Sequence, residues 1–394
     1  MTARARLRGL GLVLLPLLAF LSAASACGGG EEIPFGLKSE VVTQADNADA
    51  IVFAPDGRIF YAEQFTGNIR VITADGQRLD QPFAQVQIAN WLPLEWGLTG
   101  LALDPDFAKN HYLYAFFTSP VVEGAAPTGR PMLVRFTDRD NQGVDRKVII
   151  GDFPETIVNH QGFKANGKIH FGPDGLLYLT IGDYDQAKAE GPTGKPYALD
   201  LSSPVGKMLR VSEESGAAAA GNPFSDESGT DPRIFAYGFS KPFDFAFGPQ
   251  GGAIYGVDNT ASCEELNIVK SGGNYGWPDV GDFPFSDCTF GQQIKGIHFL
   301  AKEGMSAGQF LSGVGVSGLA FVSAAQYPAL GDGLLVCDLT GILRRLVLSG
   351  PQLDQVSNDD VIVKDCKRSV AVSPDGTIYY SNDTEIRRLT IQKT

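Results

Sequence analysis

The stretch FGPDGLLYLTIGD, residues 171–183, decides the fold because its pattern returns along the chain. Phe171 precedes a Pro-Asp-Gly triplet, and an apolar segment follows it. Proline fixes φ and glycine accepts the left-handed conformation, so this triplet predicts a tight turn. The segment after the turn predicts a β-strand with one buried face.

Related copies begin at Phe53, Phe247 and Val372, a variant without the glycine begins at Leu103, and a more degenerate copy begins at Leu319. Copies that recur at roughly 50 to 75 residues fit four-stranded blades with loop insertions. No amphipathic helix of about a dozen residues is evident after the N-terminal segment, which argues against βαβ architectures. We therefore predict an all-β protein, a six-bladed β-propeller.

The composition is that of a globular protein. Of the 394 residues, 43% are hydrophobic and 20% charged, and the 47 glycines indicate many tight turns. The net charge of −13 argues against a nucleic-acid partner, because phosphate binding needs a basic surface.

The first 27 residues have the pattern of a signal segment. Three arginines precede a short apolar run, and Ala24-Ser25-Ala26 supplies the small residues before Cys27. The pattern predicts a bacterial lipoprotein anchored to the membrane only through Cys27, with a secreted soluble protein as the alternative. Residues 28–35 then form a tether, and 36–394 form one propeller domain.

Four cysteines remain beyond Cys27, and an even number in an exported chain favours disulfides. Three pairings are possible. Proximity in sequence favours Cys263–Cys288 and Cys337–Cys366.

Three features are candidates for a functional site. His160 lies in the polar loop VNHQGFKANGK, where an imidazole can act as a general base. Arg368 lies just ahead of the last predicted strand, Lys241 lies in a comparable position before the strand that starts at Phe247, and both could hold an anion at a channel mouth. The alternative for all three is a solvated loop or blade edge.

The third feature is the stretch CEELNIVKSGGNYGWP, from Cys263. Its Gly272-Gly273 turn could aim the Glu265 carboxylate and the Tyr275 carbonyl at one point, an oxygen environment that suits calcium. The alternative is an ordinary hairpin with a packed aromatic end.

These residues, with GLTGLALDPDF from Gly97, Asn159-His160-Gln161-Gly162, GKMLRV from Gly206 and RIFAYGF from Arg233, resemble the glucose/sorbosone dehydrogenase family. The resemblance runs from about residue 40 to the C-terminus. It implies a six-bladed propeller that uses pyrroloquinoline quinone (PQQ) to oxidise aldoses. It further implies that His160 takes the proton of the sugar C1 hydroxyl, Arg368 holds a cofactor carboxylate, and Glu265 with Tyr275 binds calcium.

The chain departs from the family at four places. Gly238 is followed by Phe239-Ser240-Lys241 instead of Arg-Asn, Cys366 replaces the first cofactor arginine, and Thr340 replaces a lysine. The segment 163–166 is an insertion after the His160 loop. Lys241 and Lys367 are candidates to replace the lost cations.

We thus expect a PQQ-dependent oxidation of an aldose or related polyol, with an electron acceptor that the sequence does not identify. The alternative from another class is a non-catalytic, calcium-stabilised propeller that binds a glycan or protein at the cell surface. A lactonase-like hydrolase is a third, weaker hypothesis.

Overall fold

The computed structural model describes residues 33–89, 96–121, 128–156, 164–184, 190–249, 252–278, 288–289 and 294–391. The predicted signal segment with Cys27, and the tether up to residue 32, lie outside the described residues, as does His160. No helix in the described part is long and apolar enough to cross a membrane.

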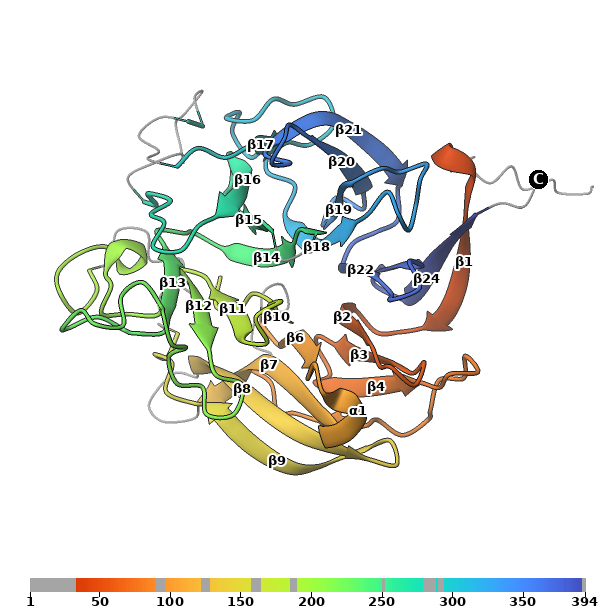
Figure 1. Cartoon of the computed structure of the whole chain (residues 1–394), viewed down its shortest axis with the longest axis horizontal. Helices are drawn as coiled ribbons and strands as arrows, with labels where there is room; N and C mark the ends of the chain where they lie inside the picture. The colour runs from red at the N-terminus through yellow and green to blue at the C-terminus, as the bar shows by residue number, and fades with distance from the viewer. Residues whose placement is uncertain are drawn as a thin grey trace, which may run out of the picture. The chain divides into compact units, whose positions relative to one another are not determined.

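The described strands form six antiparallel sheets of four strands each, placed around a ring (Figure 1). From the innermost strand outward, the first three sheets are β2 (Ala48–Phe53), β3 (Ile59–Glu63), β4 (Asn68–Ile72) and β5 (Ala84–Gln85); β6 (Leu98–Leu103), β7 (Tyr112–Val121), β8 (Thr128–Arg139) and β9 (Gln142–Ile150); and β10 (Ile169–Phe171), β11 (Leu177–Ile181), β12 (Lys207–Val211) and β13 (Ile234–Tyr237). The other three are β14 (Pro242–Phe247), β15 (Ile254–Asp258), β16 (Glu264–Val269) and β17 (His298–Leu300); β18 (Val316–Val322), β19 (Gly333–Asp338), β20 (Leu343–Ser349) and β21 (Gln355–Val363); and β22 (Ser369–Val372), β23 (Ile378–Ser381), β24 (Glu385–Ile391) and β1 (Leu37–Gln44).

The sixth sheet closes the ring with the two ends of the chain. The N-terminal strand β1 pairs antiparallel with the C-terminal strand β24, from Leu37 opposite Ile391 to Gln44 opposite Glu385. The innermost strands contact one another in the cyclic order β2, β6, β10, β14, β18, β22 and back to β2. The predicted six-bladed β-propeller is confirmed.

The Pro-Asp-Gly triplets make the turn between the first and second strand of a blade. Gly57 and Gly175 have φ of 89° and 76°, which side chains rarely tolerate, and each donates its N–H to the carbonyl three residues earlier. The copy at Leu103 lacks the glycine and instead forms the one-turn helix α1 (Phe107–Asn110). Two short 3₁₀ turns, η1 (Pro34–Gly36) and η3 (Tyr197–Leu199), complete the described helical elements.

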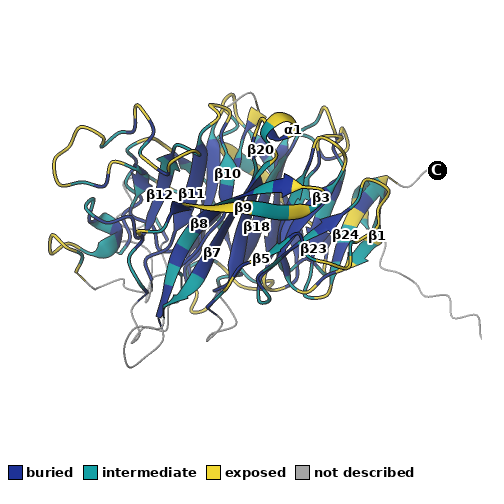
Figure 2. Ribbon diagram, turned by 90° about the horizontal axis from the view of Figure 1, so that it is seen from below, coloured by how far each residue is buried: buried dark blue, intermediate teal, exposed yellow. Residues whose placement is uncertain are grey.

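The hydrophobic core fills the spaces between neighbouring sheets. Buried residues follow the strands, and exposed residues gather on the connecting loops (Figure 2). Between the second and third sheets, Tyr114 and Phe116 of β7 belong to one fully buried cluster with Ile169 and Leu179. Burial of each such side chain stabilises the fold by about 1.5–3 kcal/mol, so the blades hold one another in place.

Two disulfides are present: one lies within the fourth blade, and the other ties β19 to the segment that connects β21 with β22. Cys263 is bonded to Cys288, and Cys337 is bonded to Cys366. Both predicted pairings are confirmed.

Candidate functional site

A cavity of about 330 Å³ lies where the innermost strands begin. Asp49 is the second residue of β2, Lys241 precedes β14, Val316 opens β18, and Arg368 precedes β22; all four line this cavity. Two residues that the sequence predicted as anion ligands, Lys241 and Arg368, therefore share one site, although they are far apart in the chain.

Arg368 is fixed by a carboxylate and an amide. Its Nε donates to Asp383 Oδ1 at 2.8 Å, and its Nη1 donates to Gln64 Oε1 at 3.3 Å. The Arg368 and Lys367 cations help to hold the pKa of Asp383 below its usual value, against the effect of burial. Lys367 contacts the same carboxylate at 3.1 Å but does not line the cavity.

Lys241 is positioned through its backbone. The N–H groups of Ser240 and Lys241 donate to the two carboxylate oxygens of Asp258, at 2.9 and 2.5 Å. Burial raises the pKa of Asp258 to about 7. The Lys241 ammonium lies 5.0 Å from the centre of the Phe243 ring, within the cation–π range. Asp258 thus fixes the backbone of Ser240 and Lys241, in the segment that departs from the family pattern, and so positions Lys241 at the cavity.

A third cation, Lys164, also lines the cavity, and sequence reasoning missed it. Its Nζ donates to Ser240 Oγ at 2.8 Å and lies 3.9 Å from Asp183 Oδ1. Lys164 has φ of 58°, an unusual conformation that clusters at functional sites. The available signal was its position inside the insertion at 163–166.

The stretch from Cys263 reaches this site through Trp277. The indole Nε1 donates to Asp183 Oδ2 at 2.6 Å, and Lys164 lies 5.3 Å from the Trp277 ring. Tyr275 is buried, stacks on Phe239 at 4.5 Å, and donates its hydroxyl to the Ile268 carbonyl. The aromatic end of the stretch therefore packs as a hairpin would, and it also supports the lysine.

The calcium prediction gains no support from side-chain clustering. Glu265 pairs in β16 opposite Asp258 and Phe299. Burial raises the pKa of the Tyr275 hydroxyl to about 12, and the nearby Glu265 charge contributes. Across the described residues, no group of three or more His, Cys, Asp or Glu side chains could hold a metal ion. Calcium at Glu265 and Tyr275 stays a prediction, and no chemistry below depends on it.

Glu264, one position earlier, belongs to the cavity wall. It accepts hydrogen bonds from the N–H groups of Val314 and Gly315, at 2.6 and 2.7 Å. Burial raises its pKa to about 8. At neutral pH this carboxyl is mostly protonated, so it opposes an anion in the cavity only weakly.

The other two departures from the family pattern supply no positive charge. Cys366 is bonded to Cys337, and Thr340 donates its hydroxyl and N–H to Asp338. Lys164, Lys241 and Arg368, which come from three different blades, are therefore the cations of the described cavity wall. Three cations around a cavity of this size fit a small polycarboxylate such as PQQ.

The family model for glucose/sorbosone dehydrogenase matches residues 45–390. The aldose sugar dehydrogenase YliI of Escherichia coli is 26% identical over 387 residues, covering 94% of this chain and 95% of its own. The quinoprotein glucose dehydrogenase B of Acinetobacter calcoaceticus is 26% identical over 261 residues, covering 62% of this chain and 53% of its own. The crystal structure of a glucose dehydrogenase-type oxidoreductase from Thermus thermophilus superposes with a TM-score of 0.72 at 29% identity, covering 90% of this chain and 100% of its own.

Proposed function

The chain belongs to the glucose/sorbosone dehydrogenase family, and from this premise we propose that it oxidises an aldose or related polyol with PQQ held in the cavity of Lys164, Lys241 and Arg368. The observation that carries the proposal is the convergence of these three cations. They occupy the cavity although the chain lacks one arginine and one lysine of the family pattern.

The cations would hold the three carboxylates of the cofactor. Arg368 offers a planar guanidinium oriented by Asp383, which suits a carboxylate, and the two lysines offer point charges. Glu264 borders the site largely in its neutral form, which limits repulsion of the anion. When bound, PQQ would supply the two-electron acceptor that no amino-acid side chain provides.

The proton of the substrate hydroxyl needs a base. We propose His160 for this role, because it precedes Lys164 closely in the sequence. Lys164 lines the cavity, so the chain enters the described structure at the site itself. His160 lies outside the described residues, so its role follows from the family resemblance and from this proximity in sequence.

We further propose that the protein is exported and anchored through Cys27. Its two disulfides fit an oxidising compartment.

Two measurements test the activity. Protein reconstituted with PQQ should reduce an artificial dye with at least one member of a broad sugar panel, and His160→Ala should abolish turnover while leaving PQQ affinity within about threefold. No turnover on the whole panel, together with no PQQ binding, would contradict the proposal. That outcome would favour a non-catalytic propeller at the cell surface.

A further inference from the structure

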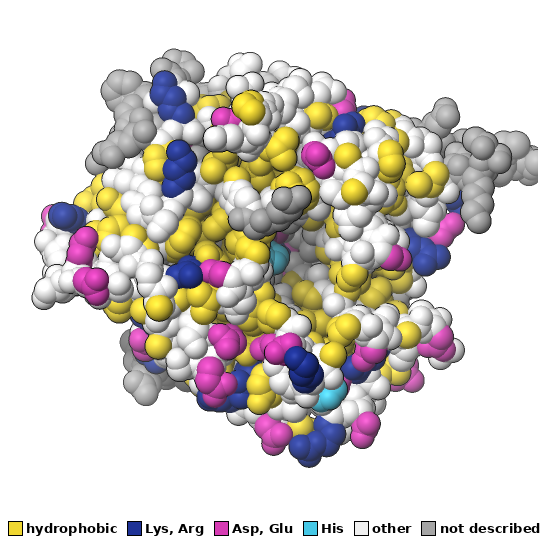
Figure 3. Space-filling view, viewed as in Figure 1, with side chains coloured by type: hydrophobic (Ala, Val, Ile, Leu, Met, Phe, Trp, Pro, Cys, Tyr) yellow, Lys and Arg dark blue, Asp and Glu magenta, His cyan; other side chains and the backbone are white. Residues whose placement is uncertain are grey.

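A second cavity, of about 400 Å³, opens at the other mouth of the central channel. It is lined by the C-terminal parts of the six innermost strands, whereas the cation-lined cavity lies where these strands begin. Figure 3 shows a hollow at the centre of this face, with hydrophobic side chains around a histidine. We propose that this far-mouth cavity binds a small uncharged aromatic compound that carries one hydroxyl group, of the phenol class.

The aromatic part of the ligand would be recognised by phenylalanine side chains. Four of the six innermost strands place a phenylalanine at or next to their last residue, and all four are half-buried and line the cavity: Phe53, Phe171, Phe247 and Phe321. In three of them this is the apolar residue that precedes the turn in the repeated motif. Apolar walls favour an apolar ligand, and phenyl groups favour an aromatic one through edge-to-face contacts.

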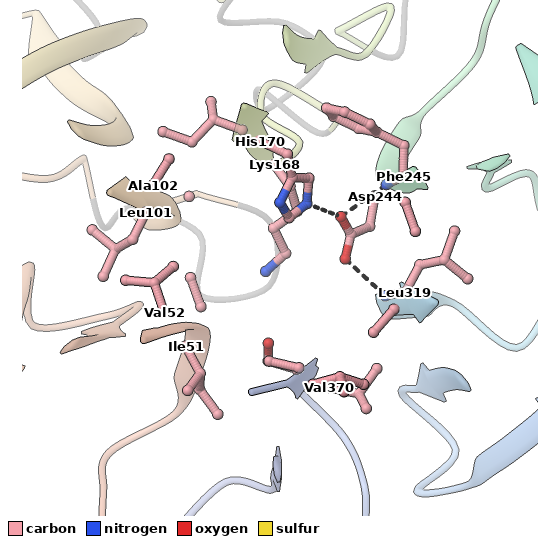
Figure 4. A pocket seen from close by; sticks show the side chains of 18 of the residues that line it. Ile51, Val52, Leu101, Ala102, Lys168, His170, Asp244, Phe245, Leu319 and Val370 are labelled. Carbon is pink, nitrogen blue, oxygen red and sulfur yellow. Dashed lines mark hydrogen bonds and ion pairs between the residues drawn. The ribbon is translucent and has the colours of Figure 1, made fainter. Parts of the chain in front are cut away.

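The hydroxyl would be recognised by His170. Its Nε2 lies 2.8 Å from Asp244 Oδ1, and the ring packs edge-on against Phe245 at 4.8 Å (Figure 4). The Asp244 carboxylate is fixed by the N–H groups of Phe245 and Leu319, both at 2.8 Å. The sequence alone indicated a structural role for this histidine, but 38% of its side chain is exposed.

The bond to Asp244 determines what the ring offers to a ligand. In the neutral imidazole, Nε2 carries the proton and donates it to the carboxylate, so Nδ1 keeps its lone pair. No described residue forms a hydrogen bond with Nδ1. The cavity therefore presents the Nδ1 acceptor of His170, which matches a hydroxyl donor on the ligand, and Ser369 adds a second hydroxyl to a lining that also holds apolar side chains.

The inner end of the cavity argues against an anionic ligand. The Lys168 ammonium is 97% buried and donates to the side chain and the carbonyl of Asp49, with 2.9 Å to Oδ2. Its charge is thus compensated within the protein. A sugar is also unsuited, because most of its hydroxyls would be desolvated against apolar walls without partners.

This site is independent of the proposed oxidation, since the two cavities lie at opposite mouths and share only one lining residue, Asp49. The test is fluorine NMR of the full protein with 4-fluorophenol, and with 4-fluoroanisole as a probe of similar shape that lacks the donor. We expect saturable binding of 4-fluorophenol and an affinity for 4-fluoroanisole that is about threefold to tenfold lower, the contribution of one neutral hydrogen bond.

Three variants complete the experiment. His170→Phe should reduce 4-fluorophenol affinity to that of 4-fluoroanisole, whereas His298→Phe, which alters the exposed pair of His298 and Asp359, should change neither. Ala320→Trp, at a half-buried wall position, should abolish binding of both probes and so tests the site even if His170→Phe fails to fold. Lys241→Ala should leave both unchanged, which separates this site from the cofactor cavity.

Absence of saturable 4-fluorophenol binding to the wild-type protein would overturn the proposal. So would equal affinity for both probes, or binding that survives Ala320→Trp.

Discussion

The Lys168 ammonium and the Asp49 carboxylate lie 2.9 Å apart on the channel wall, and this pair stands between two cavities. Lys168 lines the far-mouth cavity, and Asp49 lines both. Both side chains are almost fully buried. The pair thus lies at the boundary between the cation-lined cavity and the far-mouth cavity.

Breaking this pair should destabilise the fold strongly. Lys168→Met leaves the Asp49 carboxylate buried without its partner, which costs about 3–5 kcal/mol of unfolding free energy. The double variant with Asp49→Asn should recover part of that loss. Urea denaturation measures both. Lys38→Ala is the control, because the Lys38–Glu40 pair is exposed and should contribute less than about 1 kcal/mol. If Lys168→Met lowers the unfolding free energy no more than Lys38→Ala does, the buried pair is not needed for stability.

Removal of a cavity cation should weaken PQQ binding. Truncating one partner of a buried charged contact costs about 2–5 kcal/mol, so Lys241→Ala or Arg368→Ala should raise the Kd at least about 30-fold. Lys164→Ala should act in the same direction. Lys367→Ala is the matched control, because Lys367 contacts Asp383 but lies outside the cavity wall. Titration followed by absorbance gives the four affinities. An equal rise of the Kd for PQQ in Lys367→Ala and Lys241→Ala would contradict the assignment of Lys241 as a cofactor ligand.

The affinity for PQQ should fall as the pH rises through about 8. Burial raises the folded-state pKa of Glu264 to about 8, so this carboxyl is neutral below that pH and becomes an anion in the cavity wall above it. In Glu264→Gln the pH dependence between 7 and 9 should be lost. Calorimetry at several pH values provides the comparison, and an identical slope in both proteins would rule out Glu264 as its source.

The raised pKa of Glu264 also predicts that the free energy of unfolding depends on pH. A carboxyl with a raised pKa in the folded state favours folding fully below its unfolded pKa of 4.5, and this contribution is lost as the pH rises to about 8. The stability of the wild-type protein relative to Glu264→Gln should therefore decline across this window and then level off. Denaturation midpoints across the window would show this, and a constant difference between the two proteins would refute it.

The Cys337–Cys366 bond should stabilise both fold and site. It closes a loop of 29 residues, for which the chain-entropy model gives about 3–4 kcal/mol. Replacing both cysteines by alanine should lower the unfolding free energy by that amount and weaken PQQ binding, because Cys366 precedes Lys367 and Arg368. Denaturation and titration of the variant test the two effects, and unchanged values would contradict them.

The sequence predicted the blades well because each repeat is local. The Pro-Asp-Gly turn and the strand after it depend on neighbouring residues only, so FGPDGLLYLTIGD sufficed for the third blade. The pairing of β1 with β24 was not predicted, because the partners lie at opposite ends of the chain and their sequences carry no reciprocal signal.

The site was predicted only in part, because some of its residues are placed by contacts that no local sequence pattern determines. Arg368 and Lys241 precede recognisable strands, so their convergence followed from the propeller. Lys164 lies in an inserted segment whose path no local pattern determines. Lys207 is fully buried and donates to the carbonyls of Tyr197, Ala198 and Val205, and burial lowers its pKa to about 7. Nothing in the GKMLRV motif reveals that arrangement, because two of the three carbonyls come from the preceding 3₁₀ turn η3, outside the motif.

The most direct test of the account is a titration of the purified, calcium-supplemented protein with PQQ, followed by absorbance and calorimetry. The account predicts saturable one-to-one binding that is weakened in Lys241→Ala and Arg368→Ala and preserved in Lys367→Ala. No binding at high micromolar PQQ would contradict it, and the cavity of Lys164, Lys241 and Arg368 would then have to serve another anion.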